Sequence, residues 1–319
     1  MYIVTGGAGF IGANIVAGLN QRGEKNILIV DNMTKGEKFL NLRDLEYADF
    51  MDKTEFRESL QTGLFKDKSI DAIFHEGACS DTMEYNGKYM MDNNFTYSKE
   101  LFHFAIGKKS PFVYASSAAT YGDSTVFVEH PDNENPLNVY GYSKLFFDQY
   151  VARFLPQIKS TVAGLRYFNV YGPREEHKGR MASMVYQLHD QIRKTEEAKL
   201  FCGSGGYEDG AQRRDFIHVS DVVDVNLFLA DSPTPIHGAF NVGTGKSRSF
   251  NAIAKTLFKI LGKGKLTYRP MPEVLIEKYQ NFTEADITKL RNAGYDKPFK
   301  TLEEGITTFV ADQERRGMV

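Results

Sequence analysis

The chain has 319 residues, of which 42% are hydrophobic and 25% are charged, and its formal net charge is −2. This length suits a nucleotide-binding domain with a smaller lobe better than one minimal domain. The charge balance gives no indication of a nucleic-acid partner, and no apolar run is long enough to span a bilayer. We therefore expect an ordinary globular protein that binds neither nucleic acid nor membrane.

The cysteines and the first residues indicate the compartment, and the histidines bear on metal binding. The two cysteines, Cys79 and Cys202, are too few for a disulfide framework and suit a reducing cytosol. The seven histidines show no metal-ligand spacing, so we expect no metal. Met1 leads directly into an apolar segment and leaves no space for a signal peptide. A cytoplasmic location is the expectation.

The first predicted element is a strand over residues 2–5 that opens into a glycine-rich turn. Gly7, Gly9 and Gly12 fit the spacing G-x-G-x-x-G, and Gly6 gives the wider G-x-x-G-x-x-G. Residues without side chains let the backbone approach a pyrophosphate. The amphipathic helix predicted over residues 11–19 offers the free N–H groups of its N-terminus to phosphate oxygens. The pattern predicts a dinucleotide site.

The second predicted strand, residues 27–30, ends in Asp31. This acid comes about twenty residues after the last glycine, as the dinucleotide fingerprint requires. An acid at this place binds the adenosine ribose hydroxyls and favours NAD. However, Asn32, Lys35 and Lys38 follow and could neutralise a 2′-phosphate. From these residues alone, the choice between NAD and NADP stays open.

Further strands alternate with helical segments along the chain. They are predicted at residues 72–75, 111–115, 162–168, 213–219 and 240–242. Such alternation implies crossover connections and a parallel sheet, whose ligands lie at the carboxyl ends of the strands. Ser117, Tyr140 and Asn169 should therefore meet at the rim that carries the glycine turn.

The predicted fold class is α/β, a Rossmann-type doubly wound parallel sheet with a smaller, discontinuous α/β substrate-binding lobe. Charges and glycines mix after Pro173, which marks the change of lobe. We assign residues 1–173 and about 214–245 to the cofactor domain, and about 174–213 and 246–319 to the other lobe. Ser220 is the predicted N-cap of a helix, with Asp221 as its first-turn acid.

Tyr140 and Lys144 indicate the chemistry most directly. Four residues apart on a helix, they share one face. A free tyrosine has a pKa near ~10, and a neighbouring lysine cation is expected to lower it toward the working range. The spacing alone arises by chance on solvated helices. Together with the glycine turn and Asp31, it favours a redox site.

Longer stretches around these residues resemble one family, the extended short-chain dehydrogenase/reductases that modify nucleotide sugars. The stretches that carry this resemblance are residues 5–12, 117–122, 140–144, 166–174 and 214–216. Within that family the chain is similar to the epimerases that act on ADP-heptose. The narrower likeness lies in residues 74–80, 89–94, 177–179, 279–283 and 293–299, so that the resemblance covers essentially the whole chain.

The resemblance implies roles for the residues that match it. The implied catalytic residues are Ser117, Tyr140, Lys144 and Lys178. The implied cofactor-binding residues are Gly6, Gly9, Phe10, Ile11, Gly12, Asp31, Asn32, Lys38, Lys53, Glu76, Gly77, Ala78, Cys79, Ser80, Asn93, Tyr140, Lys144, Val170 and Lys178. The implied substrate-binding residues are Ser117, Asn169, Arg180, Gln187, Phe201, Cys202, Gly203, Ser204, Arg214 and Tyr279.

The resemblance also implies the cofactor, the assembly and the reaction. The cofactor would be NADP, with Lys38 on its 2′-phosphate, and the assembly a homo-oligomer, often a pentamer. The reaction would invert C6 of ADP-D-glycero-D-manno-heptose, a precursor of lipopolysaccharide core, through a transient 6-keto sugar. Because the sugar must turn between oxidation and reduction, Lys178 is expected to act as a second proton donor on the far side of the pocket.

Some positions depart from the family pattern. Arg180 stands where a small serine is usual and Gln187 where a histidine is usual, and residues 205–210 look like a short insertion. A dehydratase would carry an acid/base carboxylate beside its serine, whereas Ala118 and Ala119 follow Ser117 here. Two alternatives remain: an enzyme like the UDP-hexose 4-epimerases, and a non-catalytic NAD(P)-binding sensor.

Overall fold

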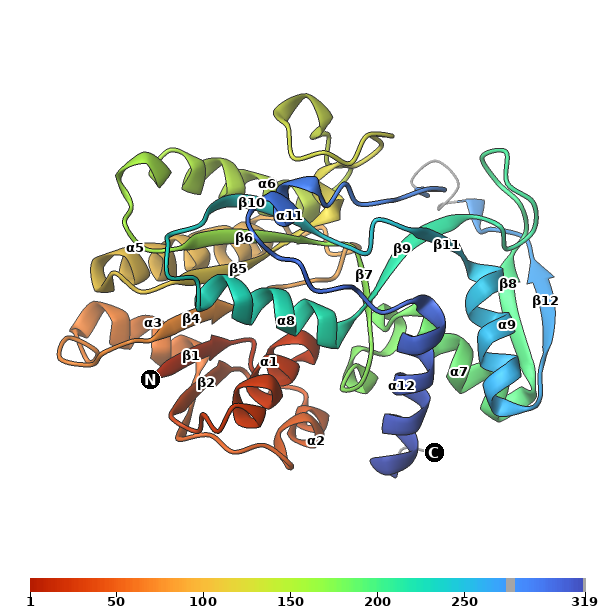
Figure 1. The fold of residues 1–319 in the computed structure, drawn as a ribbon, viewed down its shortest axis with the longest axis horizontal. Helices are drawn as coiled ribbons and strands as arrows, with labels where there is room; N and C mark the ends of the chain where they lie inside the picture. Colours follow the sequence, from red (N-terminus) through yellow and green to blue (C-terminus); the bar gives the residue numbers. More distant parts are fainter. Residues whose placement is uncertain (274–278, 318–319) are drawn as a thin grey trace.

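A computed structural model of the chain describes residues 1–273 and 279–317. Its central layer is a seven-stranded sheet in the order β10-β6-β5-β4-β1-β2-β3 (Figure 1). All neighbours in this sheet run parallel. The strands are β1 (Tyr2–Thr5), β2 (Ile27–Asp31), β3 (Asp49–Asp52), β4 (Ala72–His75), β5 (Phe112–Ser117), β6 (Val162–Tyr167) and β10 (His237–Val242). The predicted Rossmann-type sheet is confirmed.

Helices cover both faces of this sheet. On one face, α1 (Phe10–Gln21) and α8 (Val219–Ala230) pack against each other and against Val4, Ile29 and Phe74 of the strands. On the other face lie α3 (Lys53–Thr62), α5 (Tyr97–Lys108) and α6 (Val139–Ala152). Strands buried on both faces read as continuous apolar runs, which is why the sequence revealed them.

The contact between α1 and α8 depends on a glycine. A Cβ atom added at Gly18 of α1 would lie 2.6 Å from Cγ1 of Val223 in α8. Real side chains do not approach this closely, so an alanine there would force the helices apart.

The start of helix α8 corrects a prediction. The N-cap of this helix is His218 and not Ser220, and the His218 ring accepts a hydrogen bond from the backbone N–H of Ser220. Asp221 does lie in the first turn.

A second group of elements stands beside the central sheet. Helices α7 (Met184–Thr195), α9 (Phe250–Leu261) and α12 (Leu302–Arg315) share one apolar cluster with the parallel pair β8 (Glu197–Phe201) and β12 (Lys265–Arg269). A three-stranded sheet, β11 (Ser247–Ser249), β9 (Arg213–His218) and β7 (Asn169–Tyr171), lies between the two groups in Figure 1. The exact division into two lobes stays a prediction.

Strand β7 was not predicted as a separate element. The chain leaves the central sheet at the end of β6, and after Phe168 it pairs with β9 in the three-stranded sheet. The predicted strand near 213 is β9, but it lies outside the central sheet. The polar Asn169 ends the predicted strand, but nothing in the sequence indicates that the chain goes on as a strand of another sheet.

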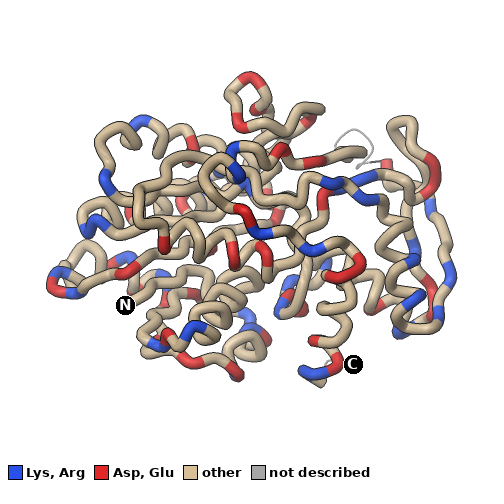
Figure 2. The backbone as a smooth tube through the Cα atoms, in the orientation of Figure 1, with Lys and Arg blue, Asp and Glu red and all other residues tan. Residues whose placement is uncertain are grey.

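The remaining elements are short. They are α2 (Phe39–Leu42), α4 (Gly87–Met91), the π turn η2 (Asp92–Thr96), α11 (Thr288–Asn292) and the 3₁₀ turns η1 (Gly36–Lys38), η3 (Ala118–Thr120), η4 (Pro131–Asn133), η5 (Leu155–Gln157) and η6 (Glu176–Met181). Figure 2 shows acidic and basic residues interspersed along the whole backbone. Across residues 1–273 and 279–317, no helix combines the length and apolar character needed to cross a membrane.

Candidate active site

A cavity of about 820 Å³ lies at the carboxyl ends of the central strands. Its wall contains every residue predicted to bind the cofactor, the four predicted catalytic residues and Asn169. These residues are scattered between positions 6 and 178, and the parallel order of the strands brings them to one rim. The structure therefore gathers them in one place, while their individual roles stay predictions.

The glycine turn has no space for side chains. A Cβ atom at Gly12 would lie 2.2 Å from the carbonyl oxygen of Gly6. Gly6 itself has φ 66°, and a Cβ there would lie 2.7 Å from the backbone of Glu76 and Gly77. Helix α1 begins just after Gly9, which provides no side-chain cap. The free N–H groups at this helix end are suited to a phosphate.

Asp31 and Lys38 form an ion pair at the edge of the cavity. The Lys38 ammonium donates to Oδ1 of Asp31 over 2.8 Å, and the backbone N–H of Ala8 donates to Oδ2 over 2.9 Å. Nearby, the ring of His177 lies 3.1 Å from the amide nitrogen of Asn41. Burial and then the Lys38 charge lower the pKa of His177 to about 4, so it is neutral at neutral pH. Asp31 is suited to hydrogen-bond the hydroxyls of an adenosine ribose, and Lys38 is suited to pair with a 2′-phosphate on that ribose.

The loop of residues 76–80 is held in place by the π turn. Asn94 accepts from the backbone N–H of Cys79 over 2.8 Å and donates to its carbonyl over 2.9 Å. Next to it, the Lys53 ammonium donates to Asn93 over 2.7 Å. These bonds fix a stretch of cavity wall that has no regular structure of its own.

Tyr140 and Lys144 lie at the start of α6. Asn138 caps this helix by accepting from the backbone N–H of Gly141 over 2.8 Å. The Lys144 ammonium donates to the carbonyl oxygen of Ala115 over 2.7 Å, which ties the helix to β5. Burial lowers the pKa of Lys144 to about 8, against the opposing charge of Glu76. Ser117 ends β5 beside this helix.

The predicted effect of Lys144 on Tyr140 is wrong for this structure. Burial raises the pKa of Tyr140 above its ordinary value, and only the hydrogen bond from Ser117 acts in the other direction. The ammonium of Lys144 instead faces a backbone carbonyl. Spacing along a helix predicted proximity correctly, but it gave no information on how deeply the phenol is buried.

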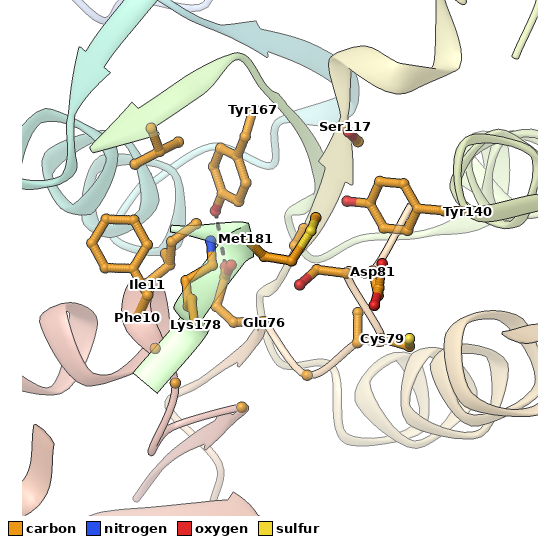
Figure 3. Close-up of a pocket in the computed structure, with 18 of the residues that line it drawn as sticks. Phe10, Ile11, Glu76, Cys79, Asp81, Ser117, Tyr140, Tyr167, Lys178 and Met181 are labelled. Atoms are coloured by element: carbon orange, nitrogen blue, oxygen red, sulfur yellow. Dashed lines mark hydrogen bonds between the residues drawn. The ribbon is translucent and has the colours of Figure 1, made fainter. Parts of the chain in front are cut away.

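Glu76 and Tyr167 form a polar pair inside the cavity. The Tyr167 hydroxyl donates to Oε1 of Glu76 over 2.9 Å (Figure 3), and Asn226 donates to the same hydroxyl over 2.9 Å. Burial raises the pKa of Glu76 to about 7, against the opposing effects of Tyr167 and the charge of Lys144. A carboxyl group that titrates near neutrality thus lies in the cavity wall.

Lys178 comes from the irregular segment that includes η6. Its ammonium lies 5.2 Å from the centre of the Phe10 ring. In Figure 3, Lys178 lies on the opposite side of the cavity from Ser117 and Tyr140. Burial lowers the pKa of Lys178, and the charge of Glu175 acts against this. Two groups able to transfer protons therefore face the cavity from two sides.

Several lining residues were not predicted. They include Tyr167, His177, Met181, Asp81 and Tyr89. His177 stands next to Lys178, and Tyr167 lies within the stretch 166–174, so both were quoted as part of a motif without a role. Tyr89 likewise begins the quoted stretch 89–94 and was given no role. No motif included Met181 or Asp81, because their place in the wall depends on how the loops fold over the cavity.

Most residues predicted to bind substrate lie outside this cavity. Arg214 is buried, and its guanidinium carbon lies 5.1 Å from the ring centre of Tyr279 and 5.8 Å from that of Phe250. Tyr279 also meets Phe201 edge to face. Burial lowers the pKa of Arg214. This group of aromatic rings around a cation could hold a phosphate and a base, so the predicted role stays open.

The other predicted substrate residues make local contacts. Cys202 accepts from Gln212 through its carbonyl, the Gly203 N–H donates to Asp209, and Ser204 donates to Asn281. Gln187 donates to the carbonyl of Ala182 over 2.7 Å. Arg180 reaches across to Asp81 at 3.0 Å on the surface. Their predicted contacts with a sugar stay predictions.

The chain belongs to the NAD dependent epimerase/dehydratase family, whose model matches residues 2–243. In doubly wound α/β folds, dinucleotides bind at the carboxyl ends of the strands beside a glycine turn, which is where this cavity lies.

Particular relatives are similar over almost the whole chain. An ADP-L-glycero-D-manno-heptose-6-epimerase of Alkalilimnicola ehrlichii is 52% identical over 312 residues, which are 97% of this chain and 96% of that protein. The crystal structure of an enzyme of the same name from Helicobacter pylori has a TM-score of 0.83 at 31% identity, over 98% of this chain and 96% of that one. A UDP-glucose 4-epimerase of Thermus thermophilus in complex with NAD has a TM-score of 0.80 at 25% identity, over 98% of both chains.

Proposed function

We propose that this protein inverts C6 of ADP-D-glycero-D-manno-heptose to give the L-glycero epimer, using NADP bound in the cavity. The observation that carries the proposal is that Ser117 and Tyr140 lie on one side of the cavity and Lys178 on the other (Figure 3). Lys144 follows Tyr140 on α6, and the glycine turn forms part of the cavity wall. The 52% identity to a relative named for this reaction supports the choice of sugar.

The chemistry requires oxidation because C6 is an unactivated carbinol carbon. No neighbouring group would stabilise a carbanion there, so direct removal of its proton is prohibitively slow. Oxidation to a 6-keto sugar makes the carbon planar, and reduction from the opposite face then gives the epimer. The hydride returns to the carbon that it left, so the whole reaction consumes no reductant.

The glycine turn fits a dinucleotide, because a Cβ atom at Gly12 would clash with the carbonyl oxygen of Gly6 and open the tight turn through which the backbone approaches a pyrophosphate. In the proposal, the dinucleotide supplies the hydride acceptor when bound. Asp31 would hold the adenosine ribose and Lys144 the other ribose. Lys38 would bind a 2′-phosphate, which makes NADP the proposed cofactor. In this structure the Lys38 ammonium pairs with the carboxylate of Asp31, and it would need only to turn from that carboxylate to the 2′-phosphate.

Ser117 and Tyr140 would hydrogen-bond the reacting oxygen in one pose of the sugar. In the oxidation, the Tyr140 oxygen would take the hydroxyl proton as a phenolate while the hydride leaves C6, so the phenol, whose pKa burial raises, must lose its own proton first. After the sugar turns by half a turn, its oxygen points away from Tyr140. Lys178, an ammonium on the other side of the cavity, would then give its proton to the keto oxygen as the hydride returns, and exchange with solvent would restore both groups.

The ADP portion would extend from the cavity toward Arg214. A buried guanidinium between the rings of Tyr279 and Phe250 suits a diphosphate, because charge-assisted bonds are strongest where water is excluded. Asn169 lines the cavity between the two places and would contact the sugar. Gln187 and residues 201–204 would complete this end of the site.

A direct experiment tests the proposal. The purified protein is incubated with ADP-D-glycero-D-manno-heptose in D₂O with no added cofactor, and the configuration at C6 is followed by proton NMR. The expected result is conversion to the L-glycero epimer by co-purified NADP, with no deuterium at C6. Incorporation of solvent deuterium at C6 would contradict the internal hydride transfer.

One other candidate has an observation in its favour. The fold matches a UDP-glucose 4-epimerase with a TM-score of 0.80, so a UDP-hexose is the second candidate substrate. Parallel incubation with UDP-glucose distinguishes the two substrates, and turnover of UDP-glucose alone would reject the ADP-heptose proposal.

We also propose the two-lobe division given above and a cytoplasmic location. A homo-oligomer of five chains is the proposed assembly, and analytical ultracentrifugation would test this oligomeric state.

A further inference from the structure

A buried carboxyl group lies just before the segment that carries Lys178. Glu175 is 0% exposed to solvent. Its Oε1 accepts from the backbone N–H of Gly172 over 3.2 Å and from the hydroxyl of Ser183 over 2.7 Å. Its Oε2 accepts from the backbone N–H of Ser183 over 2.5 Å. Three donors thus converge on one side chain that has no contact with water.

These bonds connect the two ends of the irregular segment. Gly172 directly follows β7, and Ser183 is the N-cap of α7, where its hydroxyl accepts from Tyr186. Between them, the backbone N–H of Lys178 donates to the carbonyl of Glu175 over 3.0 Å. Gly179, with φ 54°, then reverses the chain. The position of Lys178 therefore depends on the anchor at Glu175.

We propose that Glu175 is a positioning residue for Lys178, which fixes the segment 172–183 and supplies the negative charge that keeps the Lys178 ammonium protonated toward the cavity. This inference rests on the proposed function, because it assumes that Lys178 transfers a proton to the sugar.

The charges around Lys178 support an electrostatic role for Glu175. Burial lowers the pKa of Lys178, and Glu175 is the carboxylate that opposes this effect. From the same turn, His177 has a pKa lowered to about 4 and is neutral at neutral pH. From α1, the Phe10 ring faces the ammonium. From α7, the phenol of Tyr186 is near Glu175, and its pKa is raised by burial.

The charge on Glu175 should itself depend on pH. Burial raises its pKa to about 7, against the bonds from Ser183 and Gly172 and the charge of Lys178. Above about pH 7 the carboxylate is ionised and helps Lys178 to retain its proton. Below that pH it is neutral and has no such effect. Replacing Glu175 with glutamine should therefore change the protonation of Lys178 only above about pH 7.

The kinetic test compares kcat against pH for the wild type and Glu175→Gln. We expect the alkaline limb of the variant to move down by about one pH unit, while the two proteins differ little at pH 6. Ser183→Ala removes a hydrogen bond to Glu175 but leaves the Glu175 charge, so it should lower kcat without shifting the alkaline limb of the pH profile. Glu176→Gln removes a charge from the neighbouring residue and should not move it either.

A titration without turnover gives an independent measurement. Lysines are reductively methylated with ¹³C, and the Lys178 signal is assigned by its loss in Lys178→Met. In the wild type we expect this signal to show a second inflection near pH 7 from Glu175, and its midpoint to fall in Glu175→Gln. Should Glu175→Gln not fold, as circular dichroism would reveal, the wild-type inflection alone decides. Its absence overturns the inference.

The two hypotheses can fail separately. If Lys178→Met retains near-normal kcat, the role of Lys178 in the proposed function is wrong. If Lys178→Met loses activity but Glu175→Gln leaves the alkaline limb and the Lys178 titration unchanged, only the role of Glu175 is wrong.

Discussion

The two walls of the cavity are built in different ways. The strand-end wall consists of residues 6–12, 31, 76–80 and 117 with Tyr140 and Lys144 of α6, and it rests on strands and long helices. The loop wall consists of the lining residues between 167 and 184, and much of it is turn and 3₁₀ structure. Regular elements position side chains through their periodicity, whereas the loop wall depends on individual anchors such as Glu175. A comparison of variants in the two walls tests this difference.

The largest effect is expected in the strand-end wall. Tyr140→Phe removes the proton-transfer group and should lower kcat by at least ~10²-fold, the low end of general acid–base contributions. Only one oxygen is lost, so the fold should persist. The measurement is the rate of C6 inversion by NMR. Tyr142→Phe is the matched control, because Tyr142 lies on the same helix with 48% exposure. A near-normal kcat in Tyr140→Phe would remove the phenol from the mechanism.

An effect of the same order is expected in the loop wall. Lys178→Met keeps most of the length of the side chain but removes the ammonium that lies over the Phe10 ring and cannot exchange a proton, so kcat should fall by at least ~10²-fold. Lys194→Met, at the exposed end of α7, is the control. If turnover persists in Lys178→Met, the two walls are not equal partners in proton transfer and the scheme with two groups is wrong.

A smaller effect is expected at the cofactor end of the strand-end wall. Lys38→Met should weaken NADP binding by about tenfold, the equivalent of ~1.4 kcal/mol for a charge-assisted bond. The affinity for NAD should not fall, because NAD lacks the 2′-phosphate. Calorimetry with both dinucleotides measures the ratio. Equal losses for both would show that Lys38 acts through its ion pair with Asp31 instead.

The smallest effect is expected where the two walls meet. Arg180 and Asp81 pair at 3.0 Å with side-chain exposures of 74% and 35%. Exposed pairs contribute less than ~1 kcal/mol, so Arg180→Ala should change kcat/KM by less than about fivefold and should do so less at high salt. A loss of a hundredfold would instead mean that Arg180 contacts the substrate directly, as its sequence position predicts.

The same contrast explains what the sequence could predict. Gly12, Asp31 and the pair Tyr140 and Lys144 follow rules of spacing that depend on a few neighbouring residues, and these rules led directly to the strand-end wall. The central sheet was predictable because strands buried on both faces are continuously apolar. The position of Lys178 came only from the family resemblance.

Other properties depend on contacts between distant segments. The raised pKa of Tyr140 results from burial under parts of the chain that its own helix does not specify. Strand β7 follows β6 after a single residue but pairs with β9, more than forty residues further along. The bond between Tyr167 and Glu76 joins the end of β6 to the residue after β4, and these two strands are not neighbours in the sheet. No local pattern carries such information.

The packing of α1 against α8 has a consequence for synthesis on the ribosome. Helix α1 ends at Gln21, whereas the helix that covers it ends at Ala230 and the last strand of the sheet in chain order ends at Val242. Until these segments emerge, the nascent chain exposes the apolar side chains of Val16 and Leu19. The glycine turn is therefore translated well before the segments that make it rigid, and chaperones can engage the exposed helix during that interval.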